Sequence, residues 1–196
     1  MDQPKPQLNQ PQPTAPKSSL SPLAAKFLTL SLAKRQALRR FRVLKDYLNY
    51  KFYSVPADVS DQDAFTQFSA NYVREIARAG LEDDLKFIYD LGPEYLNQFK
   101  PNALKDALQD IEQAITSAKI VIVSLALELP DPEITKLGQF IKTNSGPQVL
   151  IEIQYDPALI GGCALSYNGV YRDFSIRRKI EENKKGILNT LLTYVK

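Results

Sequence analysis

Two clusters of residues have types and spacing that could carry out chemistry. Gly161-Gly162 could bring backbone N–H groups close to a phosphate. A phosphate loop, however, needs further glycines followed by Lys-Ser/Thr, or a glycine-rich turn that opens a helix, and a predicted strand follows here. Residues 82–84, Glu-Asp-Asp, offer oxygen ligands, but three consecutive carboxylates supply too few converging oxygens for a metal ion. We expect neither a cofactor site nor a metal site, and interpret the acidic cluster as the first turn of a helix.

Composition disfavours the common catalytic arrangements. The 196 residues include no histidine, which removes the commonest general base and the commonest zinc ligand. Cys163 is the single cysteine, so no intramolecular disulfide can form, and no base stands near it in the sequence. An enzyme using Ser, Tyr, Lys or carboxylates near the glycine pair remains an alternative. The sequence favours a non-catalytic protein with no catalytic residues.

A basic segment at residues 34–51 could bind nucleic acid. It carries Arg39, Arg40 and Arg42, with Phe41 and Tyr47 interleaved, and base stacking and phosphate contacts use these residue types. The aromatics fall on the apolar stripe of a predicted helix, which favours a solvated face or a basic face that meets an acidic partner. The net charge of only +3 also disfavours a dedicated nucleic-acid-binding protein. Nucleic-acid binding therefore remains the alternative function.

No segment is long and apolar enough to cross a membrane. The longest apolar run, 120–127, is far shorter than the roughly 20 residues that a spanning helix needs. The N-terminus has no apolar h-region, so we expect no secretory signal.

The first part of the chain predicts a tail and a helical bundle. Residues 1–20 are rich in Pro and Gln and predict a disordered tail. Residues 21–117 predict about four to five helices, with Ser21 and Ser60 as N-caps and Gly80 as a C-terminal cap. The predicted core stripes are Leu38, Phe41, Leu44 and Leu48; Phe65, Phe68, Tyr72 and Ile76; Leu81, Leu85 and Ile88; and Leu104, Leu108, Ile111 and Ile115.

Residues 118–196 predict a strand, a helix, three strands and a final helix. Strands are expected at 120–129 and 149–155, and Asn168-Gly169 is a strong signal for a hairpin between two short strands. The final helix carries a stripe that we expect to be core: Ile176, Ile180, Ile187 and Leu191. The predicted fold class is α+β: an N-terminal α-helical bundle followed by a small α+β domain with a mostly antiparallel sheet.

The segment from Asp156 to Ile176 is the most informative part of the sequence. Asp156-Pro157 predicts a turn, and Leu159-Ile160 are expected to point their side chains into the core. The following glycine pair permits a close backbone approach that a Cβ would block. Asp173 is expected to cap the final helix.

This arrangement resembles the C-terminal domain of the delta subunit of F-type ATP synthase, the oligomycin-sensitivity-conferring protein family. The resemblance is sharp over about residues 147–180 and looser over 118–147, while the helical half resembles the six-helix bundle of the family only in kind. The residues that match the family pattern are Asp156, Leu159, Ile160, Gly161, Gly162, Asp173 and Ser175, with Arg178 at a position that is commonly basic. We interpret them as determinants of the fold and not as contact residues.

The resemblance implies a non-catalytic stator role in proton-driven ATP synthesis. Residues 21–117 would bind the alpha and beta subunits of the catalytic head, and residues 118–196 would bind the b subunit of the peripheral stalk. It further implies a peripheral location on the cytoplasmic face of the bacterial membrane, through the complex alone. It implies no cofactor, no nucleic acid and no homo-oligomer.

Overall fold

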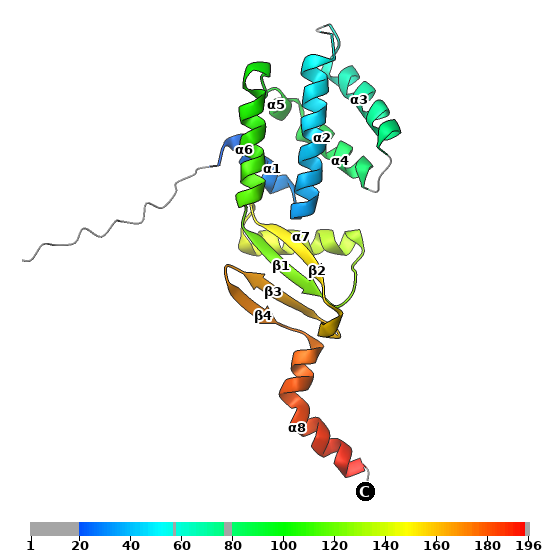
Figure 1. Cartoon of the computed structure of the whole chain (residues 1–196), viewed down its shortest axis with the longest axis vertical. Coiled ribbons are helices and arrows are strands. Elements are labelled where there is room, and N and C mark those ends of the chain that lie inside the picture. The colour runs from blue at the N-terminus through cyan, green and yellow to red at the C-terminus, as the bar shows by residue number, and fades with distance from the viewer. Residues whose placement is uncertain (1–19, 57, 77–79, 195–196) are drawn as a thin grey trace, which may run out of the picture.

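The computed structural model describes residues 20–56, 58–76 and 80–194. The predicted tail of residues 1–20 therefore lies, except for Leu20, outside the described residues. Figure 1 shows a helical bundle at one end, a small sheet in the middle and a helix that extends from the far end of the sheet. The α+β fold class is confirmed.

Six α-helical segments in the described residues precede the sheet, more than the four to five expected. They are α1 (Pro22–Leu30), α2 (Lys34–Tyr53), α3 (Asp61–Glu75), α4 (Leu81–Leu91), α5 (Pro93–Leu96) and α6 (Leu104–Ser117), with the 3-10 turn η1 (Pro101–Ala103) before α6. The sequence indicated only a break at Gly92-Pro93, because α5 is a single turn and too short to show periodicity.

The predicted N-caps are confirmed, whereas the predicted role of Gly80 is wrong. The Ser21 side chain accepts a hydrogen bond from the Ala24 N–H, and the Ser60 side chain accepts one from the Asp63 N–H. Helix α3 ends at Glu75 with Ile76 as its C-cap. Gly80, at φ +75°, instead directly precedes α4, where its left-handed conformation turns the chain into the helix.

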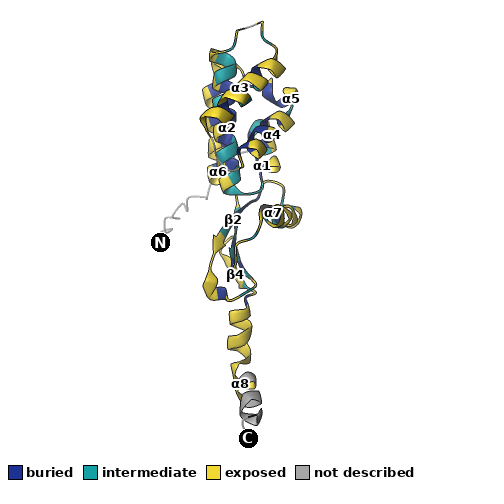
Figure 2. Ribbon diagram, turned by 90° about the vertical axis from the view of Figure 1, so that its right-hand side faces the viewer, coloured by how far each residue is buried: buried dark blue, intermediate teal, exposed yellow. Residues whose placement is uncertain are grey.

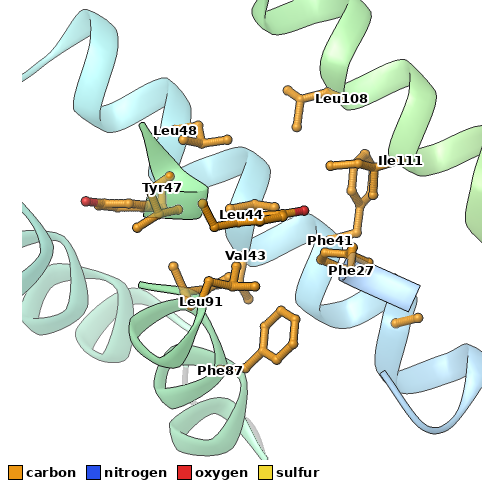
Figure 3. Close-up of a cluster of buried hydrophobic side chains, with 14 of the residues drawn as sticks. Phe27, Phe41, Val43, Leu44, Tyr47, Leu48, Phe87, Leu91, Leu108 and Ile111 are labelled. Carbon is orange, nitrogen blue, oxygen red and sulfur yellow. The ribbon is translucent and has the colours of Figure 1, made fainter. Parts of the chain in front are cut away.

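The bundle core gathers side chains from α1, α2, α4 and α6, several of which Figure 3 shows around Leu44. The fully buried large side chains of the bundle include Phe27, Leu44, Tyr47, Leu48, Ile88, Tyr95, Ile111 and Ile115. Two predicted core residues are exposed. Leu38 is exposed because Ala37 and Phe41 take the core face of α2, and Ile76 is exposed because it lies past the end of α3.

The sheet is mixed, so the predicted mostly antiparallel sheet is wrong. Its strands β1 (Ile120–Leu125), β2 (Leu150–Tyr155), β3 (Cys163–Tyr167) and β4 (Val170–Asp173) lie in the order β2-β1-β3-β4. The central strand β1 pairs parallel with β2 and antiparallel with β3, and β3 pairs antiparallel with β4. The parallel pair arises because helix α7 (Asp131–Ser145) connects its strands, and a helical crossover returns the chain in the same direction.

The predicted hairpin between β3 and β4 is confirmed, and its two-residue loop has the positive φ values that a type I′ turn requires. Asn168 and Gly169 both adopt positive φ values, +50° and +76°. The other sequence-based boundaries hold less well, since β1 ends at Leu125 and not at residue 129. The strand ends early because the chain turns away after Leu125 toward α7.

Helix α8 (Ile176–Tyr194) extends away from the sheet and is exposed along its described length (Figure 2). Ile176 and Ile180 are 46% and 44% exposed, so the expectation that they are core residues is wrong. The side chains of Ile187 and Leu191 lie outside the described residues. None of the described helices, α8 included, is apolar over a membrane-spanning length.

The bundle and the sheet share part of one core. Leu150 of β2 is fully buried within the core cluster of the bundle. The Ile151 N–H donates to the Leu32 carbonyl at 2.9 Å, and Ala33 forms a parallel bridge with Ile151. These contacts fasten β2 to the α1–α2 connection.

Lys142 of α7 makes a second connection between the bundle and the sheet. Its Nζ donates to the carbonyls of Leu28 at 2.6 Å, Thr29 at 2.8 Å and Pro147 at 2.9 Å. The first two carbonyls belong to the C-terminal end of α1, whose last carbonyls have no partner within the helix. Burial, aided by the Arg40 guanidinium, lowers the pKa of Lys142 to about 8.

Candidate interaction surfaces

The eight residues of the predicted motif meet where the sheet joins α8. We call residues 156–162 and 173–178 together the joint. Asp156 opens the 3-10 turn η2 (Pro157–Leu159), where its Oδ1 accepts from the Ala158 N–H at 3.0 Å. Leu159 is buried beside Ala126 and Ala164. The Asp156 N–H donates to the Leu125 carbonyl at 2.8 Å, which fixes the turn to the end of β1.

The glycine pair lies against the start of α8. A Cβ on Gly161 would lie 2.6 Å from Ile176 Cδ1, and the Gly161 carbonyl accepts from the Ile176 N–H at 2.9 Å. A Cβ on Gly162 would lie 2.6 Å from the Phe174 carbonyl oxygen. Gly162 also has φ +77°, which favours glycine. The pair thus allows a backbone approach between the β2–β3 connection and the β4–α8 connection.

Asp173, Ser175 and Arg178 form the hydrogen bonds at the start of α8, although their roles differ from those predicted. Asp173 Oδ1 accepts from the Ser175 N–H at 2.7 Å, one residue before α8 begins. The fully buried Ser175 accepts from the Arg178 N–H at 3.2 Å, so the side-chain cap of the helix is Ser175 and not Asp173. Arg178 Nη1 donates back to the Asp173 carbonyl at 3.1 Å. Hydrogen bonds from Ser175 lower the pKa of Asp173.

Ile160 departs from the sequence-based expectation. Its side chain is 62% exposed, not directed into the core. Its backbone lies at φ +65° and ψ −37°, a left-handed conformation that β-branched residues rarely adopt. The turn that buries Leu159 reverses direction at Ile160, and this reversal directs its side chain to solvent.

Further large apolar side chains are exposed at the joint and along α8. Phe174 is 52% exposed and precedes the α8 residues Ile176, Ile180 and Leu188, all exposed by more than 40%. Exposed apolar side chains gathered in this way are typical of interaction surfaces. Periodicity predicted the apolar stripe of α8. The sequence did not indicate whether other parts of the chain bury this stripe or leave it exposed.

The basic segment of α2 is largely occupied within the chain. Asp84 is fully buried, and its carboxylate lies 3.3 Å from Arg39 Nε and 3.8 Å from Arg40 Nε. The Arg40 guanidinium also stacks over the Phe87 ring at 4.2 Å. Phe41 and Tyr47 are buried, so they are unavailable for stacking on bases. These contacts do not favour a nucleic-acid interface.

The first-turn position of the acidic cluster is confirmed, since residues 82–84 lie in the first turn of α4. Sequence reasoning missed that the third carboxylate is buried and paired with two arginines. The signal was available in principle, because a buried acidic residue on an apolar helix face requires a basic partner.

A cleft of about 350 Å³ lies where α1 and α6 approach the end of α7. Among the described residues that line it, Lys119 is the one charged side chain, beside Leu28, Ala114 and Val149. Within the described ranges, no group of three or more Cys, Asp or Glu residues is arranged to hold a metal ion.

One family model matches part of the chain. Residues 101–187 match the family model described as ATP synthase delta (OSCP) subunit. The match begins at η1 and includes α6, the whole sheet and most of α8. The resemblance inferred from the Asp156–Ser175 motif is thereby confirmed, and the family is one of structural subunits of the ATP synthase complex. No match was found among curated proteins.

Proposed function

We propose that this chain is the delta subunit of an F-type ATP synthase and acts as a non-catalytic stator connector. The observation that carries the proposal is the family match over residues 101–187, which includes the sheet and the joint. A stator connector needs surfaces for two partners and no reaction centre. The exposed apolar residues at the joint and on α8 supply one such surface.

In this proposal the two parts of the chain bind different partners. Residues 21–117 bind the alpha and beta subunits of the catalytic head, and residues 118–196 bind the b subunit of the peripheral stalk. The chain would hold the head against the torque of the central rotor, so that proton flow changes nucleotide affinity and does not turn the head. It would lie at the cytoplasmic face of the bacterial membrane, attached only through the complex.

Reconstitution tests this role directly. Membranes that carry the ATP synthase of the same organism are stripped of this subunit, and ATP-driven proton pumping is then measured with and without the added chain. We expect pumping to be lost on stripping and restored by the chain, while ATP hydrolysis by the head persists throughout. The isolated chain should have no ATPase activity. Failure to restore pumping, or to co-purify with head or stalk, contradicts the proposal.

The alternative of a nucleic-acid-binding helical module has a simple test. Fluorescence anisotropy with single-stranded and duplex oligonucleotides at low salt should give a flat titration. A salt-dependent affinity that is lost on mutation of Arg35, Arg42 and Lys45, the exposed basic residues of α2, would favour the alternative.

A further inference from the structure

We propose that Ile160 and the apolar stripe of α8 form one continuous seat for an amphipathic partner helix whose apolar face is flanked by carboxylates. This inference rests on the proposed function, because the partner it specifies is the terminal helix of the peripheral stalk. It assigns a contact to Ile160, a residue interpreted from the sequence as a determinant of the fold. Ile160 thereby becomes a recognition residue.

The backbone of Ile160 is the first support. Glycine or asparagine would adopt its φ of +65° at a lower free-energy cost than a β-branched residue. The side chain, at 62% exposed, gains little packing within its own chain to offset that cost. Backbone strain whose free-energy cost is not offset by local packing is characteristic of functional sites. A partner that buries the Ile160 side chain would supply packing that offsets the cost of this backbone conformation.

The stripe of α8 continues from this residue. Ile176 lies against Gly161, and its N–H donates to the Gly161 carbonyl, so the stripe begins at the residue that follows Ile160 in the chain. Ile176 and Ile180 are one turn apart and therefore share a face of the helix. Both are exposed. An amphipathic helix with an uncovered apolar face gains most of its stability only when that face is packed.

The charges on α8 specify the chemistry of the partner. Residues 176–185 contain five basic residues and two glutamates, so the segment carries an excess of positive charge. The glutamates already pair with arginines, Arg177 with Glu181 and Arg178 with Glu182. By helical periodicity Lys179 and Lys184 lie on opposite edges of the Ile176–Ile180 stripe. A partner helix with carboxylates beside its apolar face would meet both lysines.

A protein helix fits these features better than a lipid surface does. The seat is not confined to one helix face, because it continues onto Ile160 at the end of the sheet. The mode is therefore that of a helix lying in an apolar seat, with the anchors Ile176 and Ile180 one turn apart.

Calorimetry on the full chain tests the seat. The probe is a synthetic peptide of the last residues of the stalk b subunit from the same organism, about 25 residues long so that it covers α8 and the joint at 1.5 Å per residue. Ile160→Asn should retain or raise the melting temperature, because asparagine tolerates the left-handed conformation, yet weaken peptide binding at least about tenfold. Ile180→Asn should weaken binding similarly.

The matched control is Phe140→Asn. Phe140 is 67% exposed on α7 in the same half of the molecule but outside the seat. Loss of the Phe140 side chain should leave the affinity for the peptide unchanged within about twofold. Neutralising both edge charges, Lys179→Gln with Lys184→Gln, should weaken binding and reduce its salt dependence. Circular dichroism of every variant checks that the fold is kept.

The outcomes separate this inference from the proposed function. If the wild-type chain binds the peptide and Ile160→Asn and Ile180→Asn bind it equally well, the seat is wrong and the stator role stands. If the wild-type chain binds neither the peptide nor the assembled complex, the proposed function fails and the seat fails with it. If Ile160→Asn and Ile180→Asn bind the peptide normally but no longer bind phosphatidylglycerol vesicles, the seat is a lipid-binding surface and the proposal is overturned. If they bind the peptide normally but no longer self-associate, the seat binds a second copy of the chain, which also overturns the proposal.

Discussion

At Gly162 the backbone leaves no space for a side chain. Its positive φ disfavours any other residue, and a Cβ would lie 2.6 Å from the Phe174 carbonyl oxygen, a backbone atom that cannot move alone. We expect Gly162→Val to destabilise the chain by more than about 2 kcal/mol, through strain and through separation of the two connections at the joint. Urea unfolding followed by circular dichroism measures the change.

Gly186→Ala is the matched control for Gly162→Val. Gly186 lies in α8 with no positive φ, and a Cβ added there would have no atom within 4 Å outside its own helix turn. Alanine should therefore be neutral or stabilising through its helix propensity. A well-folded Gly162→Val protein that had lost only partner binding would show that Gly162 is a contact residue and not a determinant of the fold.

Lys142 predicts a distinct dependence of stability on pH. Its folded-state pKa of about 8 lies below its ordinary value of 10.5, so the folded state releases the proton first as pH rises. The unfolded state binds more protons between those two values, and the contribution of Lys142 to stability therefore rises with pH across that window. The same contribution is lost as pH falls through about 8.

Comparison with Lys142→Met isolates this contribution. The variant removes the donor to three carbonyls and should lower the free energy of unfolding by about 1–3 kcal/mol. The difference between wild type and variant should grow between pH 8 and 10, as measured by urea unfolding at several pH values. A difference independent of pH would show that Lys142 keeps an ordinary pKa.

At the scale of elements, the features that the sequence predicted are local. The caps at Ser21 and Ser60 and the Asn168-Gly169 turn each depend on residues within three positions of one another. The mixed pairing of the sheet is not local, because it depends on which strand lies beside β1 after α7 has crossed over. Periodicity likewise finds an apolar face but not its partner, and for this reason the stripe of α8 was assigned to the core.

The exposure of α8 predicts its behaviour in solution. A helix without tertiary packing opens locally with little free-energy cost, whereas α6 buries Ile111 and Ile115 completely in the bundle. Amides of α8 should exchange with deuterium at least about a hundredfold faster than those in the middle of α6. Addition of the stalk peptide should slow exchange in α8 and leave α6 unchanged. Equal protection of the two helices in the free chain would contradict this arrangement.

At the scale of the whole molecule, Leu150 makes the bundle and the sheet depend on each other. The residue belongs to β2 but lies in the core of the bundle. Leu150→Ala should cost about 2–4 kcal/mol and lower exchange protection in α2 and in β1 by the same free energy. Gln154→Ala, on the exposed end of the same strand, should change neither. Loss of protection in one part alone would show that the two parts unfold independently.

The position of Leu150 could not be predicted from the sequence. The alternation of side chains along residues 149–155 predicts that Leu150 and Ile151 point to opposite faces of the strand. The structure agrees, since the two residues belong to different core clusters. What the pattern could not indicate is that a bundle built from residues more than 30 positions earlier covers that second face. The joint was more predictable, because the sequence already placed a close backbone approach at the glycine pair.

The attachment of β2 to the α1–α2 connection also has a mechanical consequence. The bundle and the sheet are linked by a shared core, by the β-bridge between Ala33 and Ile151 and by the contacts of Lys142. These two parts should therefore deform little relative to each other under load. Among the described residues, hydrogen bonds within the short joint connect α8 to the rest of the chain. If the chain bears a twisting load between two partners, the elastic compliance of the connection resides at the joint, and bending there stores the strain between successive turnover events.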